Sequence, residues 1–271
     1  MTMGASLRRV AAILLRLFYL LRGSSARVVP LFAWQAVDIV LWGFISRYLN
    51  TLSSARFNFI PALLGAIILW DFLVRALHGV IVAFFEDVWS RNFLNIFAAP
   101  IAISEYLTGL VLFSVATSVV VLAVMVVLAT AAFGLQFFTI GVMLVPFLLL
   151  LFLFGVALGI FGAAIVLRWG PAAEWLIWPL PALLSPLACV FYPLSALPGW
   201  LQWVARLVPP TYVFEGMRGV LEGRGTQLTP MLICTALTTL ALLAACRAFL
   251  RVYRHAVRTG LIARYSAETV S

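Results

Sequence analysis

The sequence has no lysine, only two histidines and only three cysteines among its 271 residues. A nucleotide-binding loop of the G-x-x-x-x-G-K-[ST] type and a Schiff-base enzyme both require lysine, so the chain carries neither. The cysteines (Cys189, Cys234 and Cys246) lie in apolar runs without metal-ligand spacing, which favours packing roles. We therefore predict no catalytic residue and no metal site.

Charge is also scarce, because 10% of the residues are charged and 65% are apolar. Soluble domains carry about 25% charged residues. Residues 106–167, 175–205 and 225–246 contain no acidic or basic side chain at all. Runs of this length are typical of transmembrane helices, and their apolar character is continuous rather than alternating, which excludes a barrel. The sequence predicts an all-α polytopic membrane protein.

We expect one transmembrane domain over 1–271, with a bundle of six spans over 28–250 and a tail over 251–271. The predicted spans are 28–48, 59–85, a third and fourth within 101–167 that break near 134–136, 175–192 and 228–250. Prolines at 179, 181 and 186 predict that the fifth span is kinked or broken. Gly155 and Gly159 form a small-xxx-small pair, which predicts close helix packing.

The segment 7–22 is apolar but carries four arginines within one arc of a helix. These are Arg8, Arg9, Arg16 and Arg22. We expect an interfacial helix within residues 1–27, its arginines directed toward lipid headgroups. A signal peptide cleaved after 24–26 is the alternative, but Arg16 interrupts the apolar stretch that it needs.

Four ionisable residues fall within the first two spans: Asp38, Asp71, Arg75 and His78. A charge at mid-span costs about 2.5–3.5 kcal/mol, so these groups should face protein or water. Asp71 and Arg75 are i, i+4 neighbours on one helix face. Two interpretations stay open: an ion pair that holds spans together, or polar groups that line a conduit.

The segment Glu86–Pro100 is the most amphipathic break between apolar spans. Trp89, Phe93, Ile96 and Phe97 fall on one face of a helix, and Asp87, Arg91 and Asn95 fall on another. Glu86 and Asp87 would occupy its first turn, where acids favour the helix dipole. A short helix of this kind is suited to docking against other spans, a lipid surface or another protein.

Residues 193–225 predict two short helices separated by Pro209-Pro210. The first, 199–207, would be about 13 Å long, far short of a bilayer core of about 30 Å. We expect a re-entrant hairpin, with an interfacial loop anchored by tryptophans as the alternative. Glu215 is expected to pair with Arg218, and Arg218 with Glu222.

Arginine counting sets the orientation. With six spans, twelve arginines fall on the side of both termini and of residues 86–100, against five on the other side. We therefore expect both termini to be cytoplasmic and the 193–225 hairpin to be external. The net charge of +9 would face anionic inner-leaflet lipids rather than nucleic acid.

Two segments resemble one known family. Ser185-Pro186 and the following FYPLSALPGWLQWVARLVPPTYVFEGMRG are similar to the external hairpin of the permease subunits of type-2 ATP-binding-cassette (ABC) exporters. Glu86 and the run up to AAPIAISEYLTG resemble that family's coupling helix, although VWSRNFLN replaces its frequent Gly-Thr-Leu-Glu. The order of the other segments also resembles that of this family, along nearly the whole chain.

The resemblance implies an exporter permease in the bacterial inner membrane, paired with a second copy as a homodimer and with two separate ATPase subunits that hold ATP and Mg. It implies no cofactor in this chain. The expected ATPase-coupling residues are Glu86, Asp87, Trp89, Arg91, Phe93 and Asn95. The expected external gate comprises Phe191, Tyr192, Trp200, Trp203, Tyr212, Glu215 and Arg218.

The apolar, aromatic pathway favours an amphiphilic substrate, such as a lipid, a lipid-linked glycan or a hydrophobic drug. Two alternatives belong to other classes. One is a lipid-modifying membrane enzyme centred on Asp38, Asp71, Arg75 and His78, although no catalytic motif accompanies them. The other is an ion-coupled carrier, for which the expected inverted repeats are not visible.

Overall fold

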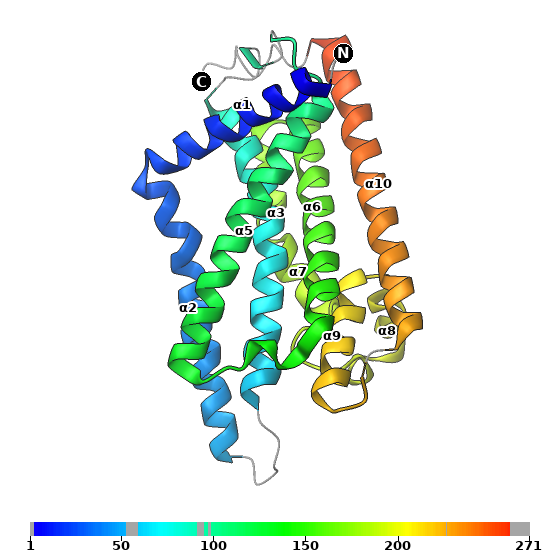
Figure 1. The fold of residues 1–271 in the computed structure, drawn as a ribbon. Helices are drawn as coiled ribbons and strands as arrows, with labels where there is room; N and C mark the ends of the chain where they lie inside the picture. The colour runs from blue at the N-terminus through cyan, green and yellow to red at the C-terminus, as the bar shows by residue number, and fades with distance from the viewer. Residues whose placement is uncertain (1–2, 53–58, 91–94, 97–98, 226, 261–271) are drawn as a thin grey trace.

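The computed structural model describes residues 3–52, 59–90, 95–96, 99–225 and 227–260 as an all-helical bundle (Figure 1). The longer helices are α1 (Met3–Arg22), α2 (Ser25–Leu52), α3 (Gly65–Trp89), α5 (Ile103–Phe133), α6 (Leu144–Trp169) and α10 (Leu228–Thr259). The shorter elements are η1 (Ile60–Leu64), η2 (Phe137–Met143), η3 (Pro171–Leu176), α7 (Leu180–Leu187), η4 (Leu194–Ala196), α8 (Gly199–Ala205) and α9 (Pro209–Leu221).

Five helices in the described part of the chain are long and apolar enough to cross a membrane. They cover Ser25–Leu52, Ile60–Trp89, Ile103–Phe133, Gly141–Trp169 and Leu228–Thr259. The break that we expected between the third and fourth spans is confirmed, because α5 ends at Gly134 in a left-handed conformation (φ 69°). The fifth span that we expected over 175–192 is not among them, and the break that its prolines predicted is confirmed.

The fifth crossing is divided into η3 and the eight-residue helix α7, since its prolines cannot donate the hydrogen bonds of a continuous helix. The chain nevertheless passes from the end of the bundle where α6 finishes to the opposite end, where α8 lies (Figure 1). The described chain therefore begins and ends at the same end of the bundle. We call this end the α1 end, because α1 lies across it (Figure 1).

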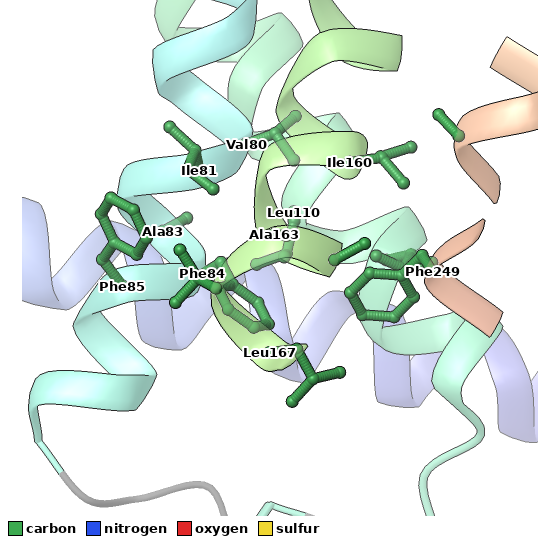
Figure 2. Close-up of a cluster of buried hydrophobic side chains, with 14 of the residues drawn as sticks. Val80, Ile81, Ala83, Phe84, Phe85, Leu110, Ile160, Ala163, Leu167 and Phe249 are labelled. Atoms are coloured by element: carbon green, nitrogen blue, oxygen red, sulfur yellow. The ribbon is translucent and has the colours of Figure 1, made fainter. Parts of the chain in front are cut away.

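The core forms where α3 packs against α5 and α6, with α10 on the far side of α6. Figure 2 shows part of this core, in which Val80 and Phe84 of α3 approach Ile160 and Ala163 of α6, with Phe249 of α10 beside them. In lipid, close packing replaces the hydrophobic driving force between helices.

The predicted close approach at Gly155 and Gly159 is confirmed. A Cβ at Gly155 would lie 2.5 Å from the carbonyl oxygen of Leu73, and one at Gly159 would lie 2.8 Å from Cβ of Val80. At Gly155 the obstructing atom is backbone, which cannot rotate away. The two helices therefore contact each other through bare backbone.

Three helix boundaries differ from the sequence expectation. α3 continues to Trp89, so Glu86 and Asp87 occupy its last turn rather than the first turn of a new helix. No glycine or proline near residue 85 stops the helix there. α10 continues through Thr259 into the expected tail, and α9 begins at Pro209 rather than Thr211 because proline fits a first helical turn.

Gly155→Ala tests the backbone contact between α3 and α6. We expect it to lower the free energy of unfolding by about 1–3 kcal/mol, because the added methyl group must push α6 away from Leu73. Thermal unfolding of the purified chain in detergent measures the effect. Gly199→Ala, where a Cβ meets no atom within 4 Å, is the control. Equal midpoints for the two variants would contradict the contact.

Candidate functional site

A set of ion pairs at the α1 end joins α1 and the start of α2 to α3 and α5. We call this set the arginine clamp. It consists of Arg9 with Glu105, Arg16 with Asp87, and Arg27 with Glu86. The partners are 59 to 96 residues apart in sequence. Its acids lie on both sides of residues 90–102, the segment that connects α3 to α5.

Asp87 is the buried centre of the clamp, with 1% of its side chain exposed. Arg16 of α1 binds it with both terminal nitrogens, at 2.6 Å from Nη1 to Oδ1 and 2.8 Å from Nη2 to Oδ2. The hydroxyl of Tyr106 in α5 donates to Oδ2 at 2.7 Å. One carboxylate therefore connects three helices, and it does not lie on the outward polar face that the sequence predicted.

The outer pairs fix the two ends of α1. Arg27 reaches Glu86 through Nε and Nη2, at 2.8 and 2.9 Å, and also donates to the carbonyl of Leu20 at 3.1 Å. Near the other end, Nη1 of Arg9 donates to Glu105 at 3.2 Å. Glu105 also accepts the backbone N–H of Ala102 at 2.9 Å, which caps the start of α5.

The electrostatics of the clamp explain its arginines. Glu86 and Asp87 lie at the C-terminal end of α3, where the helix dipole disfavours acids, so cations must compensate them. Partial burial would lower the pKa of Arg16, but the hydrogen bond and the charge of Asp87 outweigh it and the pKa is raised. Arg9 and Arg16 thus bind carboxylates, which corrects our expectation that they face lipid headgroups.

The other expected coupling residues are placed only in part. Trp89, the last residue of α3, is half-exposed at the α1 end and its ring lies 5.4 Å from that of Phe85. Asn95 is exposed and helical. Arg91 and Phe93 lie outside the described residues. Trp89 therefore remains accessible to a partner while Asp87 does not.

Arg16→Ala tests the clamp. We expect it to lower the free energy of unfolding by about 3–5 kcal/mol, because it leaves the Asp87 carboxylate buried without a cation. Arg8→Ala removes an exposed arginine from the same helix and should have little effect. Thermal unfolding in detergent compares the two, and equal losses would show that Asp87 does not depend on Arg16.

At the opposite end, Glu215 and Arg218 of α9 hold the turn that follows α7. The predicted pair forms at 2.9 Å. Nη2 of Arg218 also donates to the carbonyl of Cys189 at 2.8 Å, and Glu215 accepts the backbone N–H of Leu194 at 2.7 Å. The expected Arg218–Glu222 pair is wrong, because Glu222 binds Arg224 instead.

The aromatic residues of the expected gate fall into two groups. Phe191 stacks on Trp42 of α2 at 4.2 Å, and the hydroxyls of Tyr192 and Tyr212 donate to the carbonyls of Pro186 and Arg206 at 2.7 and 2.8 Å. Partial burial raises the pKa of Tyr212. Trp200 and Trp203 are instead exposed. Three aromatic residues therefore fix the turn. The other two are exposed, and the guanidinium of Arg206 lies 5.0 Å from the ring of Trp203.

Cys189 has a φ of +53°, a left-handed conformation that costs energy in any residue other than glycine. We expect Cys189→Val to be destabilising by about 2 kcal/mol, because β-branched residues disfavour this conformation most. Cys189→Gly relieves the strain and should be tolerated. Protease sensitivity of residues 188–197 reports the difference. Valine tolerated as well as glycine would contradict a fixed left-handed turn.

Of the two interpretations of the intramembrane residues, the ion pair is not found. Asp71 and Arg75 are both buried, yet no ion pair joins them, although both belong to the part of the chain that the structure describes. The ring of His78 lies 4.9 Å from that of Trp178, and Asp38 is half-buried on α2.

Sequence reasoning missed Glu105, Tyr106 and the pairing roles of Arg9, Arg16 and Arg27. One signal was available: Glu105 is the third residue of α5, where an acid can cap the helix. For Tyr106 and the arginines no local pattern identifies the partners.

Within the described ranges, no group of three His, Cys, Asp or Glu side chains could hold a metal ion. The fold defines a multi-pass helical membrane protein with a charged network at one end and a pinned helical hairpin at the other. Residues 22–221 match the family model described as ABC-2 type transporter, so the chain belongs to that family. A search of curated proteins gives no match.

Membership decides several points. The chain is an ABC-2 membrane permease domain, which itself lacks ATPase activity, and such permeases generally pair with ATPase subunits. The alternative of a lipid-modifying enzyme is thereby set aside.

Proposed function

We propose that this permease forms, with a second copy of itself, the pathway of an exporter for an amphiphilic substrate, driven by two ATPase subunits that dock at the α1 end. ATP-driven closure of those subunits pushes on residues 86–97. The movement tilts the first two spans and opens the pathway outward past the 193–225 hairpin.

The observation that carries the proposal is the arginine clamp. Its acids flank residues 90–102 on both sides, and its arginines belong to α1 and the start of α2. Force applied to this segment therefore reaches α1 and α2 through charge-assisted hydrogen bonds, which are among the strongest polar contacts in proteins. In the proposed mechanism, Asp87 and Glu86 transmit the movement and Trp89 contacts the ATPase.

Arginine distribution supports a cytoplasmic location for the α1 end in a bacterial inner membrane. The arginine-rich helix α1, Arg168 at the end of α6 and the last turns of α10 all lie at this end (Figure 1). Cytoplasmic flanks of membrane helices carry an excess of arginine and lysine. The hairpin would then be external.

The coupling proposal is tested by pull-down with an ATPase whose reading frame lies beside that of this chain. We expect Trp89→Ala and Arg91→Ala each to reduce the recovered ATPase by about tenfold, because tryptophan and arginine side chains dominate interface energies. Trp175→Ala is the matched control, since Trp175 is an exposed tryptophan that follows α6 at the same end. Unimpaired binding and transport in both variants would refute the assignment.

A further inference from the structure

A second polar site lies halfway along the bundle, away from the clamp. Asp71, Arg75 and His78 follow one another at i, i+4 and i+7, so they share one face of α3. Gln35 and Asp38 lie on α2, whose Asp38 is close enough to Asp71 for their charges to interact. We call these five residues the polar seam.

The buried polar atoms of the seam do not all find hydrogen-bond partners within the described chain. Asp71 and Arg75 are 6% and 8% exposed. Four of the seven buried side-chain atoms that have no hydrogen-bond partner in the described part of the chain belong to the seam: Oε1 of Gln35, Oδ2 of Asp71, Nε of Arg75 and Nε2 of His78. Buried polar atoms are nearly always partnered, and ionisable groups inside a membrane mark functional sites. Four such atoms on α2 and on one face of α3 indicate a site built for something that the chain does not supply.

The charges of the seam are separated along α3. Asp71 interacts with Asp38 of α2, which makes one end acidic. Arg75 acts electrostatically on His78, one turn nearer the α1 end, which makes the other end basic. Asp71 and Arg75 are four residues apart, about 6 Å along the helix axis. A ligand that satisfies both ends must carry a cation and an anion a few ångströms apart.

An open apolar groove runs along α2 and includes Val37, the residue next to Asp38 in the chain. It is formed on α2 by Ala36, Val37, Val40, Leu41, Phe44, Ile45 and Tyr48, and its volume is about 670 Å³. Leu41 and Ile45 follow Asp38 by three and seven residues, so they lie on the same side of α2. A group held at Asp38 could thus extend a hydrocarbon chain along the groove.

We propose that the polar seam binds the headgroup of a zwitterionic amphiphile. The cationic group lies between Asp38 and Asp71, the anionic group accepts hydrogen bonds from Arg75, and the tail occupies the α2 groove. That the bound amphiphile is the exported cargo rests on the proposed function, whereas its binding to the seam does not.

Three probes with the same twelve-carbon tail separate the charges: dodecylphosphocholine, dodecyltrimethylammonium and dodecyl phosphate. Binding to the full chain in lipid nanodiscs is measured by calorimetry below the micelle concentration, with empty nanodiscs subtracted. We expect dodecylphosphocholine to bind at least about tenfold more tightly than either singly charged probe, because only it satisfies both ends.

The variants assign each charge. Asp71→Asn should weaken binding of the zwitterionic and cationic probes about tenfold and leave binding of the anionic probe unchanged. Arg75→Gln should weaken binding of the zwitterionic and anionic probes. Arg75→Lys should restore part of the loss, which shows that the variants are folded. Glu222→Gln and Arg47→Gln remove exposed charges outside the seam and should change nothing.

Equal affinity for the three probes, or tightest binding of either singly charged probe, would overturn the proposal. So would variants that change the monomer–dimer equilibrium but not probe affinity, since the seam would then meet a second copy. The assay uses the permease without ATPase. Charge-selective binding alongside an unaffected Trp89 pull-down would therefore reject the coupling assignment and leave the seam standing.

Discussion

The contact between Arg16 and Asp87 constrains the rest of the structure. A carboxylate buried at the C-terminal end of a helix is opposed by desolvation and by the helix dipole, so it requires a cation at hydrogen-bonding distance. In the structure α1 supplies that cation, and this places α1 across the end of the bundle. Arg9 and Arg27 extend the same pairing to both ends of α1. The position of α1 follows from charge as well as from its apolar residues.

The centre of the bundle follows a different rule, because lipid removes the hydrophobic advantage of burying one apolar helix against another. α3 contacts α6 where Gly155 and Gly159 have no side chain, and it contacts α5 where a Cβ at Gly79 would lie 2.4 Å from Oγ of Ser114. The hydroxyl of Ser114 donates to the carbonyl of Ala76 at 2.9 Å. Close backbone packing and this hydrogen bond thus hold α3 against α5 and α6 at its centre.

Hydropathy predicted the helical class, five continuous spans, the break at Gly134 and the two hairpin helices, because these depend on local composition. It failed at Glu86 and Asp87, because only their distant partners Arg27 and Arg16, 59 and 71 residues away, explain why acids end this helix. For Asp71 and Arg75 it left an ion pair and a conduit open, since i, i+4 spacing permits an ion pair but does not enforce one. Charge pairing between distant helices is a property of tertiary structure, so the clamp could not be predicted from local patterns.

The clamp and the polar seam share α3, which connects one site to the other. α3 is continuous from Gly65 to Trp89, so Arg75 lies twelve residues, about 18 Å, from Asp87. A rigid helix cannot tilt or turn at one end without moving the side chains at its middle. Asp38 belongs to α2, a separate helix that the pair of Arg27 with Glu86 joins to the end of α3. Displacement of residues 90–102 would therefore change the distance between Asp38 and Asp71. In the proposed mechanism this changes the affinity of the seam for a headgroup without direct contact between the ATPase and the cargo.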